Sequence, residues 1–314
     1  MGIKQRLIKN KTVYKMYILF YGMKQLIKGL KYTNQSDESK IYQISHRLER
    51  GLCLDKKQYK MKWGFRKANE LLCILDRNKN TENDSFKIGC AVLAAFIREK
   101  EELAHEEEAE ELKELKAAIA EKNIRIEVDE SFGGIVKVNK EDLLCDNATT
   151  SLLLSNRHSC REFSDEPIDL EKLKKAIDLA NRAPSSCNRQ ATDVYVIDAK
   201  EREKITGEND FGADKYLIIC GKMDSYGTHE INDWFVSTGI FCGYLSVALQ
   251  AVGIGSVFMR KEIISKSGYN ISVREKCGIP DNQQIIIEMA IGNYCDSFYV
   301  PLSKRKKTDE LLHF

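Results

Sequence analysis

Proline is absent from the first half of this chain. The sequence has 314 residues and four prolines, and the first of them is Pro167. Proline breaks helices because it has no backbone N–H and its ring clashes with the preceding turn. A first half without proline therefore predicts a helical region, and the prolines that follow indicate a mixed α/β region. The length favours two domains.

The common nucleotide-binding and metal-binding patterns are also missing. The sequence has no G-x-G-x-x-G, no G-x-x-x-x-G-K and no G-x-S-x-G motif, so a dinucleotide would have no Rossmann domain of its own. Its ten cysteines form no Cys-x-x-Cys pair and show no His/Cys metal spacing. This pattern predicts reduced thiols, no metal and a cytoplasmic protein.

Long apolar runs are missing near the N-terminus, and so are acidic residues. The run Met16–Met23 is far below the ~18–20 apolar residues that span a bilayer. Residues 1–32 contain eight Lys or Arg and no Asp or Glu, although the net charge of +2 argues against nucleic-acid binding. A basic, aromatic-rich helix over 3–32 fits two roles. The commoner role is packing on its own domain or a second subunit, and the other is peripheral contact with the inner membrane face.

The first region is predicted as a mainly helical domain over residues 1–145. Two helices are expected within 38–78, with Gly51 as a C-cap, and one long helix over 84–122. Alternating residues on both sides of Gly133-Gly134, at 124–128 and 135–138, predict a short hairpin.

The second region, residues 146–314, is predicted to mix helices and strands. Apolar runs at 194–197, 216–220 and 285–291 indicate strands. Asp169 is expected to cap a helix that stops before Pro184. A helix from Asp233 to Val252 is apolar nearly all round, which predicts burial on every side, partly against another subunit.

Two short segments carry the clearest chemistry. Arg157-His158-Ser159-Cys160-Arg161 places two guanidinium groups and a hydroxyl within five residues, which suits a phosphate; the alternative is a pair of surface ion pairs. The stretch 183–190, Ala-Pro-Ser-Ser-Cys-Asn-Arg-Gln, is a proline-fixed turn with hydroxyls and an amide. It suits the polar edge of a flat ring, and the alternative is an ordinary helix C-terminus.

Together the two segments resemble the FMN-dependent nitroreductase family, over residues 147 to 314. The resemblance implies an α+β fold, an α/β sandwich with an antiparallel or mixed sheet flanked by helices. It implies a homodimer with FMN at the interface. It also implies ping-pong hydride transfer from NADH or NADPH through flavin N5 to an unidentified small-molecule acceptor, of the nitroaromatic or quinone kind. The rival hypothesis is a non-enzymatic binding protein, in which the helical half makes the functional contact.

The family pattern assigns cofactor-binding residues but no catalytic side chain. It implies phosphate contacts from Arg157, His158, Ser159 and Arg161, ring contacts from Pro184, Ser185, Ser186 and Asn188, flavin contacts from Phe258, Met259 and Arg260 in the loop 253–260, and a basic residue near the C-terminus, here Arg305. Two departures stand out: Gln190 is followed by Ala191-Thr192 rather than proline and an aromatic residue, and Phe258 replaces a frequent proline.

His46 and its neighbours Arg47 and Glu49 form the remaining polar cluster. A histidine with ion-pairable neighbours can act as a proton donor over an active site. The commoner use of such a cluster is a polar contact between helices, and the sequence leaves both open.

Overall fold

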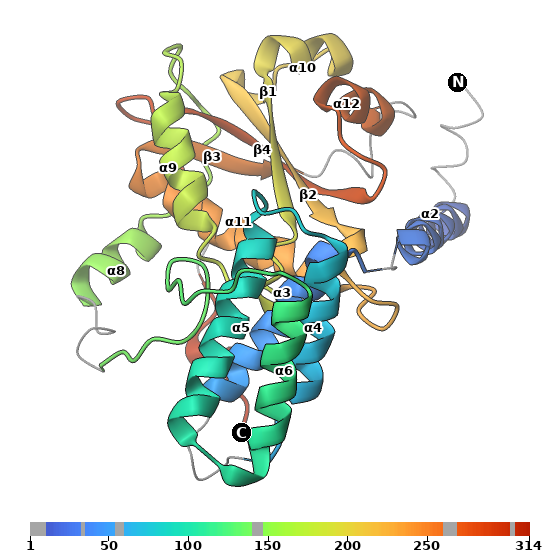
Figure 1. The fold of residues 1–314 in the computed structure, drawn as a ribbon. Helices are drawn as coiled ribbons and strands as arrows, with labels where there is room; N and C mark the ends of the chain where they lie inside the picture. The colour runs from blue at the N-terminus through green and yellow to red at the C-terminus, as the bar shows by residue number, and fades with distance from the viewer. Residues whose placement is uncertain (1–10, 33–34, 54–59, 140–146, 260–268, 302–304) are drawn as a thin grey trace.

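The N-terminal part of the chain is a helical bundle. The computed structural model describes residues 11–32, 35–53, 60–139, 147–259, 269–301 and 305–314 (Figure 1). The bundle region comprises α2 (Lys11–Tyr32), α3 (Asp37–Leu52), α4 (Phe65–Arg77), α5 (Asp84–Leu103), the 3-10 turn η2 (Glu106–Glu108) and α6 (Ala109–Glu121). Figure 1 shows α3 to α6 side by side, with α2 apart from them. The predicted helical character of this region is confirmed.

Helices α3, α4, α5 and α6 share one core. Leu48, Leu75 and Phe96 are almost wholly buried in it, and Leu115 of α6 closes it. Side-chain caps set where two of the helices begin, because an oxygen of Ser36 accepts from the Ser39 N–H and one of Asn83 from the Ser85 N–H.

The predicted single helix over 84–122 is wrong. Helix α5 ends at Leu103, and Ala104 takes a left-handed conformation with φ 47°. The chain then turns back, and the carboxylate of Glu108 lies 3.0 Å from the ammonium of Lys100. These side chains are 1% and 4% exposed, and a buried lysine needs a carboxylate partner. Tertiary pairing has therefore overridden a continuous helical pattern.

Gly51 is not a C-cap, because α3 continues to Leu52 and Cys53 caps it. A Cβ on Gly51 would lie 1.8 Å from Cη2 of Trp63, so this glycine makes room for an indole ring. The predicted hairpin is also wrong, because residues 124–128 and 135–138 form no strand. Instead Ile124 is buried against the helical core, and the Gly134 N–H donates to Glu49, at 3.1 Å.

A four-stranded antiparallel sheet organises the second region. Its strands are β1 (Thr192–Asp198), β2 (Lys215–Lys222), β3 (Ile254–Met259) and β4 (Gln283–Asn293), in the order β1-β2-β4-β3. Leu217 on β2 and Phe258 on β3 both pair with Met289, which places β4 between them. The three predicted strands are confirmed. The segment predicted as the loop 253–260 is a turn at Gly253 (φ 83°) followed by β3.

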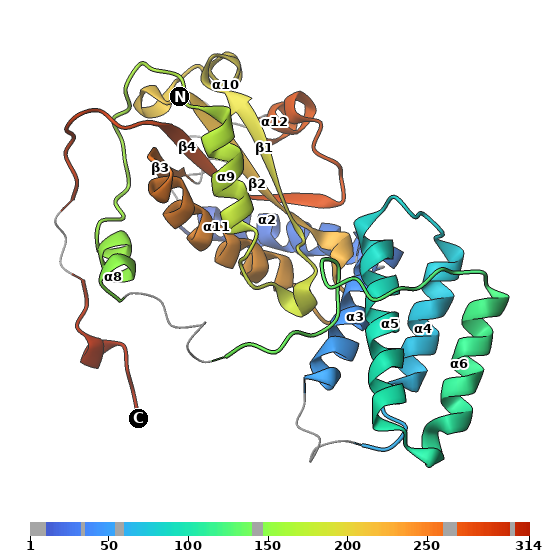
Figure 2. The same ribbon diagram turned by 60° about the vertical axis from the view of Figure 1, so that its left-hand side comes forward.

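Helices cover both faces of the sheet, which confirms the α+β prediction. On one face lie α9 (Leu170–Ala180) and α11 (Asp233–Ala251), with α8 (Asn147–Ser155) beside α11. On the other lie α10 (Ala199–Thr206) and α12 (Tyr269–Cys277), as Figures 1 and 2 show. Short 3-10 turns lie in the connections: η3 (Ser186–Asn188), η4 (Asp210–Gly212) and η5 (Met223–Ser225). A fourth, η6 (Thr308–Glu310), follows the last strand. Asp169 caps α9 as predicted, since it accepts from the Glu171 N–H at 2.8 Å.

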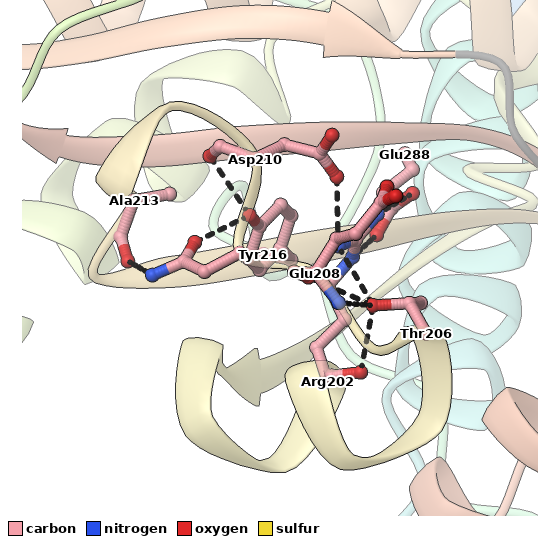
Figure 3. Close-up of polar contacts among 8 residues, drawn as sticks. Arg202, Thr206, Glu208, Asp210, Ala213, Tyr216 and Glu288 are labelled. Carbon is pink, nitrogen blue, oxygen red and sulfur yellow. Dashed lines mark hydrogen bonds and ion pairs between the residues drawn. The ribbon is translucent and has the colours of Figure 1, made fainter.

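A buried arginine locks α10 to the sheet (Figure 3). Arg202 of α10 pairs with Glu288 of β4 and, at 2.9 Å, with Asp210. Its guanidinium also lies 4.0 Å from the ring centroid of Tyr216 on β2. Burial raises the pKa of Tyr216 to about 12, so its hydroxyl stays protonated.

Helix α11 is not buried on every side within one chain. Phe235, Val236, Ile240 and Tyr244 are 38%, 56%, 38% and 46% exposed along one face. By length and composition α11 could cross a membrane, but half of it is buried in the fold, as in the core helix of a water-soluble domain.

Candidate functional site

The loop 184–190 is held on the first turns of α11. The Ser186 hydroxyl donates to Asp233 at 3.0 Å, and the Ser186 N–H points to the Ser237 hydroxyl at 3.4 Å. Within the loop, Ser185 accepts from the Gln190 N–H at 3.0 Å through its hydroxyl. The loop is thus tied both to itself and to the helix, while Pro184 and Asn188 stay exposed.

The loop backbone adopts an uncommon conformation. Cys187, Asn188 and Gln190 have φ of 52°, 49° and 50°, three of the seven non-glycine residues with positive φ in the described part of the chain. Left-handed backbone is costly for residues with a Cβ and persists only where surrounding contacts enforce it. Such conformations concentrate at binding and catalytic sites.

The described residues leave only a small cavity between the loop and α11. The cavity between the loop and α11 is lined by Ser185, Gln190 and Thr192 on one side and by Ser237 and Phe241 on the other. It measures about 10 Å³, which holds about one water molecule. A flat ring at this place would therefore need a second wall.

The segment 157–161 lies on β3, away from that loop. The Cys160 N–H donates to the Ser256 carbonyl at 2.9 Å, and Cys160 is buried. A Cβ on Gly255 would lie 3.1 Å from the Cys160 sulfur, so the glycine permits this close approach. Burial raises the pKa of the Cys160 thiol, which favours a packing role over a nucleophilic one.

The side chains beside Cys160 are available to a ligand. Arg157, His158 and Ser159 are half-buried, and Arg161 is exposed. Among the residues that the structure describes, none forms an ion pair with Arg157 or Arg161, so the surface ion-pair alternative has no support there. Two guanidinium groups within five residues, neither with an ion pair to a described residue, leave strong anion-binding capacity.

The other predicted residues fall in three different settings. Phe258 is 36% exposed, whereas Met259 points into the core, so any Met259 contact with a ligand is made by its backbone. Strand β3 is at the sheet edge, and alternate backbone groups of an edge strand point away from the sheet. Arg260 lies outside the described residues. Arg305 is exposed, and no described contact joins it to the segment 157–161.

The two predicted groups lie at opposite ends of α11. Ser186 bonds to Asp233 in the first turn, whereas Gln250 in the last turn donates to the Leu153 carbonyl of α8, at 3.0 Å. At a helical rise of ~1.5 Å per residue these ends are roughly 25 Å apart. One chain therefore does not bring the 157–161 segment and the 184–190 loop together (Figure 2).

The cluster around His46 does not converge on one point. Glu49 accepts from Gly134, whereas Arg47 lies 3.3 Å from the side-chain oxygen of Gln43, with that amide oriented toward the guanidinium. Burial, and next the charge of Arg50, lower the pKa of His46. A neutral histidine is a poor proton donor at pH 7, so the arrangement favours the polar-contact alternative.

Sequence reasoning overlooked Arg189, although it lies inside the second motif. Its side chain is completely buried, and its Nη2 lies 3.0 Å from Glu230. Its guanidinium also lies 5.1 Å from the ring centroid of Tyr226. Its partners come from distant parts of the chain, so no local signal marks it. In the described residues no group of three or more His, Cys, Asp or Glu side chains is placed to hold a metal.

Comparison with known proteins places this region. The nitroreductase family model matches residues 154–210, which contain both motifs. An FMN reductase (NAD(P)H) of Bacillus subtilis is 29% identical over 126 residues, 33% of this chain and 51% of that protein. A nitrobenzene nitroreductase of Ectopseudomonas oleovorans is 41% identical over 54 residues, 17% of this chain and 24% of that protein. The chain thus spans about half, or less, of the curated relatives it matches.

Solved nitroreductase structures align with about half of this chain. A nitroreductase family protein from Clostridium difficile 630 has 25% sequence identity and a TM-score of 0.43, over 52% of this chain and 95% of that one. A nitroreductase with bound FMN from Desulfitobacterium hafniense has 20% identity and a TM-score of 0.44, over 54% and 100%. The predicted resemblance of the C-terminal half to the nitroreductase family is confirmed by the family match.

Proposed function

We propose that this chain is an FMN-dependent oxidoreductase. It takes reducing equivalents from NADH or NADPH and passes them to a small acceptor of the nitroaromatic or quinone kind, in ping-pong order. The observation that carries the proposal is the pair of guanidinium groups, Arg157 and Arg161, that no described residue neutralises, beside a hydroxyl at Ser159. The family match over 154–210 and the names of the curated relatives support it.

The residues present fit FMN. Arg157, Ser159 and Arg161 would hold the terminal phosphate through charge-assisted hydrogen bonds, and Gly255 keeps their segment close to β3. The hydroxyls and amide of the 184–190 loop would orient the polar ring edge. When bound, FMN supplies the hydride-transfer chemistry. The chain supplies binding, orientation and exclusion of water, and no side chain is assigned as a general acid.

We propose that two copies form the site. The segment 157–161 and the loop 184–190 lie at opposite ends of α11. A two-fold related copy would set the 184–190 loop of one chain against the β3 edge of the other. The exposed face of α11 suits this contact, because Phe235, Val236, Ile240 and Tyr244 are apolar. Gly239 and Gly243 alternate with them and have nothing within 4 Å, which leaves room for a close helix.

The dimer proposal is tested by filling that room. Gly239→Leu fits the isolated chain, because nothing lies within 4 Å of the added Cβ, but it blocks a close partner. We expect a monomer by sedimentation and a loss of FMN, with a normal circular dichroism spectrum. An FMN-replete monomer would contradict the two-copy site.

The oxidoreductase proposal is tested by an absorbance spectrum, followed by anaerobic NADH or NADPH. A yellow protein that bleaches supports it. A yellow protein that keeps its colour contradicts nicotinamide as the donor and points to another donor or to dehydrogenation. A colourless protein that takes up no FMN contradicts the proposal and favours the non-enzymatic binding protein. Arg157→Ala with Arg161→Ala should abolish FMN retention, and a flavin-replete double variant would refute the phosphate assignment.

We further propose that the protein is cytoplasmic and contacts the inner membrane face through α2. The observation is an exposed apolar surface on α2, made by Met16, Leu19, Phe20, Met23, Leu26, Ile27 and Leu30. Exposed lysines accompany it, and residues 1–32 carry no acidic side chain, which suits an anionic lipid surface. The test is co-sedimentation with vesicles of anionic and of neutral lipids. Equal binding by the full chain and by a chain without residues 1–32 would contradict the contact.

A further inference from the structure

Helix α3 of the N-terminal bundle packs directly on the 184–190 loop. Gln43, in the middle of α3, accepts a hydrogen bond from Arg189 of the loop, with its amide oriented toward the guanidinium. The beginning of α3 is fastened beside it, because the Ser36 N–H donates to the Asp224 carbonyl at 3.0 Å and the Ser39 hydroxyl donates to the Ser225 carbonyl. The bundle thus touches the loop and the neighbouring η5 turn at once.

Arg189 is the point where these contacts meet. Its side chain is completely buried, and Glu230, from the segment before α11, is the carboxylate that it pairs with among the described residues. A buried guanidinium is costly unless it is compensated, so its position is dictated by its partners. Those partners belong to two separate segments: α3, which carries Gln43, and the connection between η5 and α11, which carries Tyr226 and Glu230.

The backbone on both sides of Arg189 is strained. Asn188 precedes it and Gln190 follows it, both left-handed, with Cys187 left-handed one residue earlier. A loop with three such residues does not keep this shape by local preference alone, so an outside restraint is needed. The guanidinium of Arg189 is the side chain in the middle of this run, and it is anchored outside the loop.

We propose that Arg189 is a positioning residue, through which α3 and Glu230 hold the 184–190 loop in the shape that contacts the flavin ring. The N-terminal bundle is then a brace for the cofactor loop. This inference rests on the proposed function for FMN as the ligand, but the bracing itself is independent of FMN. It gives the bundle a role that neither motif revealed.

Two variants are designed to break the brace, and a third variant serves as the matched control. Gln43→Met removes the α3 acceptor at similar size, and Arg189→Lys keeps the charge but loses the planar guanidinium that reaches two partners. Glu49→Met is the control, because it removes another polar contact of α3, to Gly134, away from the loop. All three are compared as full-length proteins after their folding is checked by circular dichroism.

The first readout needs no flavin. Cys187 is half-buried inside the loop, and Cys73 on α4 is exposed, so one molecule carries both a probe and an internal reference. Iodoacetamide labelling of flavin-free protein, followed by mass spectrometry, gives the ratio of the two rates. We expect the Cys187 ratio to rise several-fold in Gln43→Met and Arg189→Lys and to stay unchanged in Glu49→Met. An unchanged ratio in the two brace variants overturns the brace.

The second readout is FMN affinity by fluorescence quenching. We expect the dissociation constant to rise roughly tenfold in the two brace variants, because a loosened loop must be ordered on binding, and to stay within about twofold in the control. Faster Cys187 labelling with unchanged FMN affinity overturns the positioning role. Equal weakening in the control also overturns it. Failure of the unaltered protein to bind FMN contradicts the proposed function instead, and the labelling ratio still decides the brace.

Discussion

Arg202 and Arg189 are both completely buried, yet they are built differently. Arg202 has two carboxylate partners, Asp210 and Glu288, and donates to the Glu208 carbonyl at 3.1 Å (Figure 3). Arg189 has one carboxylate, and its Nε and Nη1 have no partner among the described residues. Arg202 links α10 and β4 within the α+β half, whereas Arg189 joins that half to the bundle. The many partners of Arg202 hold α10 in a fixed position on the sheet, as a lock would. The fewer partners of Arg189 couple the position of the 184–190 loop to that of α3.

The largest expected effect comes from opening the saturated network. Arg202→Met leaves Glu288 as a buried carboxylate without its cation, which costs about 3–5 kcal/mol of the free energy of unfolding. Urea denaturation monitored by circular dichroism measures this loss. The variant that still folds should bind FMN normally, because the network lies on the sheet face opposite α11. A loss below about 1 kcal/mol would contradict its role as a lock.

Removing the single carboxylate partner of Arg189, Glu230, should have a smaller effect on stability and a larger effect on FMN binding. Glu230→Gln keeps a hydrogen-bond acceptor near Arg189 but removes the charge. We expect a loss of about 1–3 kcal/mol in the free energy of unfolding, together with weaker FMN binding. Isothermal titration with FMN beside urea denaturation separates the two. Weaker stability with unaltered FMN binding would make Arg189 an ordinary anchor.

The stability that the Arg189–Glu230 ion pair contributes should also depend on pH in a defined direction. Burial raises the pKa of Glu230, but the Gly227 N–H and the Arg189 guanidinium outweigh it, so the net pKa is lowered from 4.5. A lowered folded pKa gives stability that is present above the unfolded pKa and is lost as pH falls through the folded one. Between about pH 6 and about pH 3, stability should therefore fall more steeply in the unaltered protein than in Glu230→Gln. Parallel pH profiles would contradict the ion pair.

The smallest expected effect tests one hydrogen-bonding group of the lock. Tyr216→Phe removes a hydroxyl whose single proton is shared between two acceptors, the side-chain oxygen of Asn209 at 2.8 Å and the Asp210 carbonyl at 2.9 Å. The aromatic ring under Arg202 is kept, so we expect a loss of only about 1 kcal/mol in the free energy of unfolding. Urea denaturation of this variant beside Arg202→Met shows how much of the network depends on the charge.

Local signals predicted the elements that obey local rules. Asp169 capped α9 as its side chain indicated, and the three apolar runs became strands. The errors occurred where distant residues decide the backbone. Gly51 makes room for the Trp63 ring instead of capping α3, and the Lys100–Glu108 ion pair accompanies the end of α5. Neither contact leaves a periodic trace in the sequence.

The site divides in the same way. Both motifs were visible because each keeps its chemistry within a few consecutive residues, and the family match covers them. Their separation along α11 was not visible, because it depends on how the helix lies between the loop and β3. Arg189 was overlooked because its environment is assembled from Gln43 and Glu230, which are distant from it in sequence.

The contact between Gln43 and Arg189 also limits how this chain can be divided. The α+β half has its own sheet and core, and by those criteria it is a portable unit. Cutting the chain near residue 145 would nevertheless uncover a guanidinium that is now completely shielded and hydrate the backbone around it. A protein shortened in this way would keep its sheet and its core. Its 184–190 loop, however, should be more hydrated and less ordered at the proposed ligand site. With the proposed brace, the bundle forms part of the minimal functional unit, even though it donates none of the predicted flavin contacts.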